Sequence, residues 1–154
     1  PDRGGRDPPQ GGRMKTVSKV LAARDFRWPV ALKPYKDGGE LYRDVTRQTL
    51  LGEGEGEEAL AFLTRYFEVA AGGYSTLEQH QHPHSVVILR GRGTVQLGER
   101  RFAIGPSDCV YVAPGEIHQF RADQGEALGF LCIVDRDRDR PVPVPPPAVT
   151  SGPD

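Results

Sequence analysis

Hydrophobic and polar positions alternate along the second half of the chain, in short runs that glycine and proline separate. In an extended strand successive side chains point to opposite faces, so this alternation is typical of strands buried on one side. No segment with a helical period of convincing length interrupts the runs. Short strands with frequent turns predict an all-β sandwich or barrel. The runs cover residues 60–70, 74–80, 85–90, 94–97, 100–104, 109–113, 117–121 and 128–134.

The pattern is weaker in the first part of the chain. We expect a short strand over 17–21 and an extended edge segment over 26–35, where two prolines interrupt the alternation. A further strand is expected over 45–51, followed by a glycine- and glutamate-rich loop over 52–58. These segments add edges to the predicted sheet without changing its class.

Both ends of the chain differ in composition from the rest. Residues 1–13 hold glycine, proline and charge without apolar periodicity, which predicts disorder. Residues 136–154 begin with alternating arginine and aspartate and continue into a proline-rich stretch. We expect a second disordered tail there, either flexible or lying along the domain. The single folded domain is expected to cover 14–135, with its core strands in 60–134.

Composition narrows the class of partner and the compartment. The formal net charge is −1, which gives no indication of a nucleic-acid or anionic-membrane partner. No apolar run approaches ~18 residues and no signal peptide is visible, so a soluble cytoplasmic protein is expected. The two cysteines, Cys109 and Cys132, lie inside apolar runs. We expect both to be unpaired, buried thiols in the wall of the domain.

The histidines carry the candidate chemistry. The chain has four: His80, His82 and His84 occupy every second position, and His118 follows a Pro-Gly turn. Neutral imidazole is the commonest side-chain metal ligand. Glu78 shares the parity of the three clustered histidines, so all four side chains can point the same way. Neighbouring members, roughly 6.6 Å apart along a strand, can converge on one ion through bonds of about 2.1 Å.

A straight strand would not suffice, because it would carry His84 roughly 20 Å from Glu78. Pro83 cannot donate to a central ladder, so the chain is expected to turn just before it. Glu78 and His80 would then end one strand, and His84 would open the next, facing back toward them. His82 would lie in the turn.

These motifs resemble those of the cupins, small jelly-roll barrels with an internal metal site. The usual first cupin motif has an HxH pair, a carboxylate and a later glycine. Gly91 sets the register here: His84, seven residues before it, stands where the usual carboxylate does. His80 stands at the usual second histidine and Glu78 at the usual first.

The second motif of the family usually reads Gly-Asp, an apolar strand, and then Pro-x-Gly-x-x-His. The chain has Ser107-Asp108, an apolar strand, and Pro114-Gly115-Glu116-Ile117-His118, so His118 matches the usual last ligand. The resemblance implies an all-β, double-stranded β-helix jelly-roll barrel. It also implies one divalent transition-metal ion, for which Fe, Mn, Ni, Cu and Zn are all suitable.

Two ligand sets agree with the sequence. The register and the turn favour Glu78, His80, His84 and His118 as the metal ligands. Alternatively Glu78 is not a ligand, and the set is His80, His118 and either His82 or His84. A closed structural zinc site is less consistent with the pattern, because such sites usually recruit thiolates.

The resemblance implies a mononuclear metal enzyme acting on a small organic molecule, with a dioxygenase reaction as the leading expectation. The metal would act as Lewis acid and electron conduit. His82 is a candidate proton shuttle, and Arg65, Tyr66 and Gln96 are candidate neighbours of the site. The alternative is a non-catalytic module that binds or senses a metal or small molecule. Cupins are often dimers, so the resemblance also allows a homodimer.

Overall fold

The computed structural model describes residues 17–36 and 41–145. The predicted tail over 1–13, and the predicted tail from residue 146 onward, lie outside these described residues. Within them the chain forms strands, turns and irregular segments, and no helix is long and apolar enough to cross a membrane.

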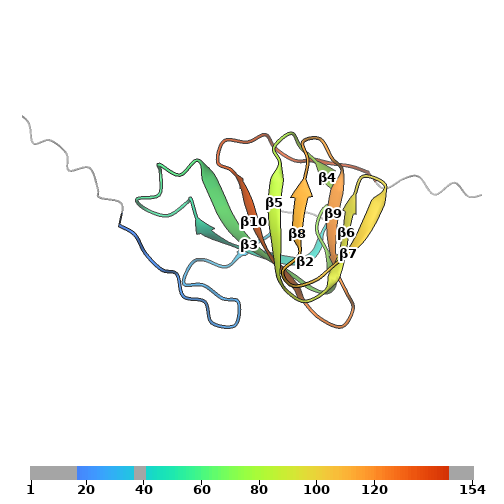
Figure 1. Cartoon of the computed structure of the whole chain (residues 1–154), viewed down its shortest axis with the longest axis horizontal. Coiled ribbons are helices and arrows are strands. Elements are labelled where there is room, and N and C mark those ends of the chain that lie inside the picture. Colours follow the sequence, from blue (N-terminus) through green and yellow to red (C-terminus); the bar gives the residue numbers. More distant parts are fainter. Residues whose placement is uncertain (1–16, 37–40, 146–154) are drawn as a thin grey trace, which may run out of the picture.

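Antiparallel pairing joins all the strands of the described part of the chain (Figure 1). The strands are β1 (Lys33–Pro34), β2 (Arg43–Leu51), β3 (Phe62–Tyr74), β4 (Glu78–Gln79), β5 (His84–Arg90), β6 (Gly93–Leu97), β7 (Arg100–Ile104), β8 (Cys109–Val112), β9 (His118–Ala122), β10 (Leu128–Asp135) and β11 (Val142–Pro143).

The sheet curls into a barrel because β3 serves both of its halves. Along most of its length β3 pairs with β2 on one side and with β10 on the other. At its far end Tyr74 pairs with Arg121 of β9, which in turn pairs with β4 and β6. One path of strands therefore runs β11-β4-β9-β3-β10-β5-β8. The all-β barrel predicted from the sequence is confirmed.

Side chains at every second position of the strands point inward and fill the interior of the barrel. In β5 the buried side chains are Val86 and Ile88, and in β8 they are Val110 and Val112. Three aromatic rings continue this core. Phe130 stacks on Phe120 with ring centroids 4.6 Å apart and packs against Phe67 at 5.6 Å. These three rings also line the cavity described below. The floor of the site is therefore part of the hydrophobic core.

Two strand predictions differ from the structure. Residues 17–21 form no strand. β3 continues past residue 70, where the predicted run ended, to Tyr74. Gly72 has a φ of +72°, and a Cβ added at Gly73 would lie 2.5 Å from the backbone oxygen of Arg43. The two glycines let the strand bend and approach its neighbour closely, so it continues to Tyr74 instead of stopping.

Both cysteines are unpaired, as predicted, but only Cys132 is buried. The expectation of a buried Cys109 is wrong. In β8 the side chains of Val110 and Val112 point inward, so the alternating positions Cys109 and Tyr111 point to solvent. The apolar run was correctly predicted to be a strand, but the side chains that point inward from it are those of the two valines.

Residues 136–145, which we call the C-terminal strap, lie along the domain, which is one of the two arrangements expected for the tail. The Arg136 guanidinium donates to the backbone oxygens of Leu60 and Glu57. Further along, β11 pairs with β4, and the backbone N–H of Val144 donates to the oxygen of Leu77. Hydrogen bonds to backbone groups hold the strap in place. Its charged and proline residues have no apolar periodicity from which this position could be predicted.

Candidate metal centre

The chain turns where Pro83 predicted it. β4 ends at Gln79, β5 begins at His84, and the segment between them is irregular. The oxygen of His80 accepts a hydrogen bond of 2.7 Å from the backbone N–H of Gly115, in the loop that leads to β9. His118 opens β9 and pairs with Glu78. The turn and this pairing bring the two distant histidine motifs to one end of the barrel.

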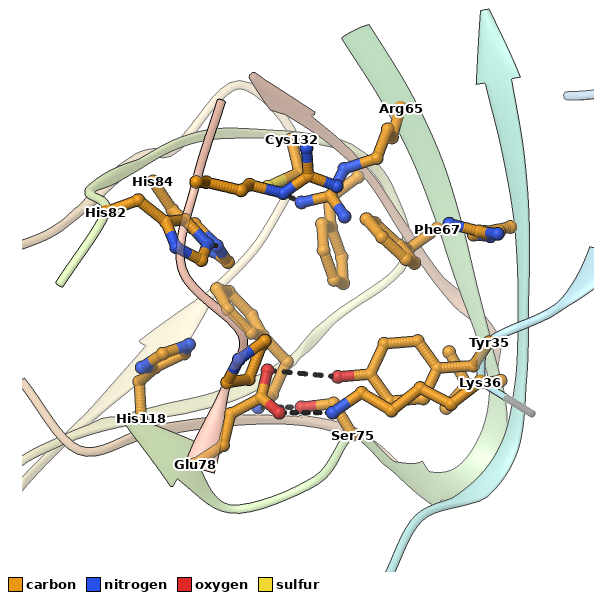
Figure 2. A pocket seen from close by; sticks show the side chains of 16 residues that line it. Tyr35, Lys36, Arg65, Phe67, Ser75, Glu78, His82, His84, His118 and Cys132 are labelled. Carbon is orange, nitrogen blue, oxygen red and sulfur yellow. Dashed lines mark hydrogen bonds and ion pairs between the residues drawn. The ribbon is translucent and has the colours of Figure 1, made fainter. Parts of the chain in front are cut away.

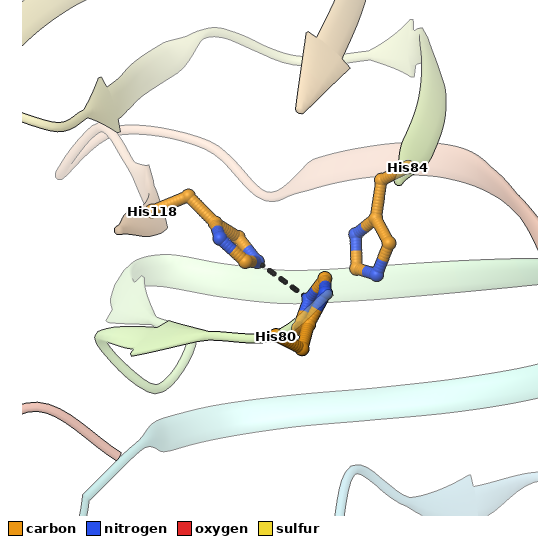
Figure 3. A group of neighbouring side chains, drawn as sticks. All are labelled: His80, His84 and His118. Carbon is orange, nitrogen blue, oxygen red and sulfur yellow. Dashed lines mark hydrogen bonds between the residues drawn. The ribbon is translucent and has the colours of Figure 1, made fainter. Parts of the chain in front are cut away.

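Three imidazoles meet there. His80, His84 and His118 each offer one nitrogen, and these nitrogens all lie within 4.8 Å of one another (Figure 3). The Nε2 atoms of His80 and His118 are 3.2 Å apart. Two nitrogens bound to one ion through bonds of about 2.1 Å lie roughly 3.0 to 3.4 Å apart for right-angled to tetrahedral geometry. The observed separation fits a shared ion.

The second nitrogens of two rings fix their tautomers. Nδ1 of His80 lies 2.6 Å from the backbone oxygen of His82, and Nδ1 of His118 lies 2.8 Å from that of Glu116. A carbonyl oxygen only accepts, so each Nδ1 carries the hydrogen and each Nε2 keeps its lone pair. Lone pairs facing each other at 3.2 Å repel unless a cation lies between them. The donor set therefore fits a metal ion.

His82 also belongs to this cluster. Its ring stacks on that of His80 with centroids 3.7 Å apart, and its Nε2 lies 3.3 Å from Nε2 of His84. On the other side of the ring, Nδ1 donates to the Asp139 carboxylate at 2.8 Å. The sequence placed His82 in the turn, where it is found, but did not identify Asp139. That aspartate belongs to a charge run that was taken as solvated.

Burial keeps these imidazoles neutral. Desolvation, reinforced by the neighbouring His118, lowers the pKa of His80 to about 4. Desolvation also lowers the pKa of His84, with His80 adding to the effect, and that of His118. A metal ligand must be deprotonated, so at neutral pH these side chains are in the form that binds an ion.

Glu78 is buried near the cluster, but its carboxylate has other partners. It accepts an ion-paired hydrogen bond from the ammonium group of Lys36, and one of 3.4 Å from the hydroxyl of Tyr35 (Figure 2). Burial and the Glu78 charge raise the pKa of Tyr35, so its hydroxyl stays a donor. The carboxylate of Glu78 thus does not belong to the group formed by the three converging imidazoles. Glu78 as a fourth ligand stays a prediction.

A cavity of about 170 Å³ adjoins the imidazoles. His82, His84 and His118 line one part of it, and the core aromatics line another (Figure 2). Its charged lining consists of one carboxylate and four cations: Glu78, Lys36, Arg47, Arg65 and Arg138. Sequence reasoning named Glu78 and Arg65 and missed the other three, which come from the first part of the chain and from the C-terminal strap.

The other predicted neighbours of the site lie elsewhere. Tyr66 alternates with Arg65 and Phe67, so it faces the opposite side of β3. There it packs against Trp28 and donates to Glu68 at 2.9 Å. The amide of Gln96 donates to the backbone oxygen of Gly98. Neither side chain lines the cavity.

The curled antiparallel barrel with imidazoles at one end defines a class: small β-barrels with an internal candidate metal site. Comparison with known proteins specifies the family. The family described as "Cupin domain" matches residues 65–134. A Rhodospirillum rubrum protein named 1-methylthio-D-xylulose 5-phosphate methylsulfurylase is 50% identical over 114 residues, which is 73% of this chain and 70% of that protein. The chain therefore belongs to the cupin family.

Solved structures agree with this assignment. A cupin-2 domain from Rhodospirillum rubrum is 44% identical, with a TM-score of 0.72 over 82% of this chain and 84% of that chain. A cupin 2 conserved barrel domain protein from Rhodopseudomonas palustris is 45% identical, also with a TM-score of 0.72, over 80% of this chain and 85% of that one. The fold and the family are thereby established independently of the histidine spacing.

Proposed function

We propose that this chain is a metal-dependent cupin enzyme that acts on a small phosphorylated sugar carrying a thioether. This is the class of substrate in the name of its Rhodospirillum rubrum relative. The observation that carries the proposal is the cavity itself. It joins neutral imidazoles, which suit a metal ion, to several cations, which suit an anionic substrate.

His80, His84 and His118 would hold the ion, with Glu78 or His82 as the fourth ligand. Three imidazoles with at most one carboxylate suit Fe, Mn, Ni, Cu or Zn. When bound, such an ion would supply Lewis-acid chemistry toward a carbonyl oxygen of the substrate.

The protein's own groups would position the substrate and move its proton. Asp139 holds the hydrogen of His82 on Nδ1, so Nε2 is free to accept a proton if it is not a metal ligand. The Lys36 ammonium group, which lies in the cavity lining, has two hydrogens beyond the one that it donates to Glu78 and can donate them to sugar oxygens. Arg138 and Pro141 of the C-terminal strap also line the cavity.

Incubation of the metal-loaded protein with 1-methylthio-D-xylulose 5-phosphate tests the proposal. With a small thiol present, the thiol sulfur would take the methylthio group as a mixed disulfide while the substrate carbon takes the thiol's proton; without it, water would replace the group and methanethiol would be released. In both cases we expect the S-methyl proton resonance of the substrate to shift. His118→Ala, with unchanged circular dichroism, should be inactive. Absence of turnover by the metal-loaded protein under both conditions would overturn the proposal.

A dioxygenase reaction is the second candidate, since three neutral imidazoles also suit Fe(II). Oxygen consumption with diketones, thiols or flavonols would identify it. Tight ligand binding without any turnover would instead favour a binding or sensing module. The three outcomes are distinct in the same set of assays.

A further inference from the structure

The cavity holds more positive charge than its own side chains neutralise. Among its cations, Lys36 is paired with Glu78. Within residues 17–36 and 41–145, the other three form no ion pair: Arg47, Arg65 and Arg138.

Two of these arginines have buried donors without a partner. Arg65 of β3 is only 9% exposed; its Nη2 donates to the Cys132 sulfur at 3.4 Å, and its guanidinium lies 4.9 Å from the ring centre of Phe67. Its Nε is buried and has no hydrogen-bond partner in the described part of the chain, and the same is true of Nε of Arg47 in β2. The protein therefore satisfies neither the charge nor all the donors of these two guanidinium groups.

The third arginine comes from a distant part of the chain. Arg138 belongs to the C-terminal strap and lines the cavity. Desolvation and the Arg65 charge lower the pKa of Arg138; Arg47 adds to this, while Glu53 and Cys132 oppose it. Three guanidinium groups from β2, β3 and the strap are thus held near one another against their mutual repulsion. A bound anion would offset this repulsion.

We infer that Arg47, Arg65 and Arg138 form a subsite for the phosphate group of the substrate, on the wall of the cavity formed by β2, β3 and the strap. Figure 2 shows Arg65 extending from β3 toward Cys132, in the same cavity as His84 and His118. A phosphate monoester presents several acceptor oxygens and close to two negative charges, which match planar guanidinium forks. The inference rests on the proposed function in taking the anion to be the phosphate of a sugar.

Binding of inorganic phosphate to the full chain tests the subsite directly. Titration calorimetry on chelator-treated protein excludes binding through a metal ion. We expect Arg65→Gln and Arg138→Gln each to weaken phosphate binding about tenfold or more, because each removes charge-assisted hydrogen bonds. Arg65→Lys should keep part of the affinity, since it retains the charge but not the fork. Arg100→Gln, at an exposed position of β7, makes the same charge change and should have no effect on phosphate binding.

Two results would overturn the subsite: wild-type protein that does not bind phosphate, or folded variants that bind it as wild type does. If Arg65→Gln fails to fold, Arg47→Gln and Arg138→Gln decide, because both side chains are only half-buried.

Kinetics separate this inference from the proposed function. In Arg138→Gln the KM for the phosphorylated substrate should rise about tenfold, while the KM for its dephosphorylated analogue should stay at the wild-type value. Turnover with an unchanged KM would overturn the subsite alone. Phosphate binding that depends on the arginines, without any turnover of the thioether sugar phosphate, would support the subsite and overturn the proposed function.

Discussion

Oδ1 of Asp139 lies 2.8 Å from Nδ1 of His82, and this pair joins the C-terminal strap to the turn between β4 and β5. The same carboxylate accepts from the backbone N–H groups of Gln81 and His82 at 2.7 and 3.0 Å. These bonds, that of Gln81 foremost, hold the pKa of Asp139 well below its usual range. Asp139 therefore stays ionised at neutral pH and fixes the direction of the His82 ring.

Removal of that carboxylate should loosen the metal centre. We expect Asp139→Ala to weaken metal binding about tenfold, because Asp139 holds the backbone of Gln81 and His82, and the backbone oxygen of His82 accepts the hydrogen bond that orients His80. Chelator competition measures the effect. Asp137→Ala, an exposed position in the same strap, is the matched control and should bind metal as wild type does. Equal losses in both variants would show a general effect of strap charge instead.

Loss of any one of the three converging imidazoles should abolish tight metal binding. His80→Ala, His84→Ala and His118→Ala each remove a nitrogen from the group that lies within 4.8 Å. Elemental analysis of protein purified without a histidine tag gives the stoichiometry. Full metal content in all three variants would refute the centre.

The fourth ligand is decided by a pair of variants. On the register set by Gly91, Glu78→Gln should lower metal affinity, whereas His82→Ala should keep a stoichiometry near one ion per chain and alter the pH dependence of activity. Both variants are compared with wild type in the chelator assay. The opposite pattern would assign the fourth position to His82, whose Nε2 already lies 3.3 Å from that of His84.

Metal-free protein should lose stability in mild acid. An imidazole in the unfolded chain titrates near pH 6.5, but that of His80 titrates at about 4 in the fold, and the pKa values of His84 and His118 are also lowered. Between these values the unfolded state binds protons that the folded state does not, so the free energy of unfolding falls as the pH falls. Each such imidazole contributes up to about 1.4 kcal/mol per pH unit.

Urea unfolding of chelator-treated protein at pH 7.5, 6.0 and 5.0 measures this decline. Stability should change little above pH 7 and fall below 6.5. A midpoint that stays constant down to pH 5 would mean that the imidazoles are not held neutral in the folded state.

The two thiols should differ in reactivity. Cys109 is exposed, whereas Cys132 is 1% exposed and burial raises its pKa. Since the thiolate is the nucleophile, we expect one thiol to react rapidly with a disulfide reagent in native protein, and the second only on unfolding. Cys109→Ser should remove the fast phase. Rapid reaction of both thiols in the native wild-type protein would show that the cavity wall opens readily.

Gly91 should tolerate no side chain. Its φ is +74°, and a Cβ there would lie 1.8 Å from the backbone oxygen of Ala127. Gly56 has a similar φ of +80°, but an added Cβ would meet nothing within 4 Å. Gly56→Ala should cost about 1 kcal/mol from backbone strain, and Gly91→Ala at least about 2 kcal/mol. Urea midpoints of the two variants isolate the steric clash, and equal midpoints would contradict it.

The barrel could be predicted because its signals are local. Alternation within each strand decides which side chains face inward, and turns occur at glycine and proline. The approach of His84 to His80 followed from the same reasoning, since Pro83 indicates a turn between them, whereas the inclusion of His118 rested on the resemblance to the second cupin motif. The barrel and the turn depend on residues a few positions apart, which the sequence displays directly.

The rest of the cavity depends on pairing between distant segments. Arg138 and Asp139 lie in a run of alternating charges that is indistinguishable from a solvated tail until β11 pairs with β4. Lys36 and Arg47 likewise reach the cavity only because β2 pairs with β3. Charged side chains have no periodicity that separates a buried partner from a solvated one, so their roles are not visible locally.

The four imidazoles all lie within the segment that matches the family, 65–134, whereas much of the charged lining comes from before and after it. Tyr35, Lys36, Arg47 and Arg138 belong to these flanking parts. The candidate metal ligands and most of the charge of the cavity are thus encoded in different stretches of the sequence. Replacement of β2 or of the C-terminal strap would therefore change the charge of the cavity and leave the stretch that holds the imidazoles intact.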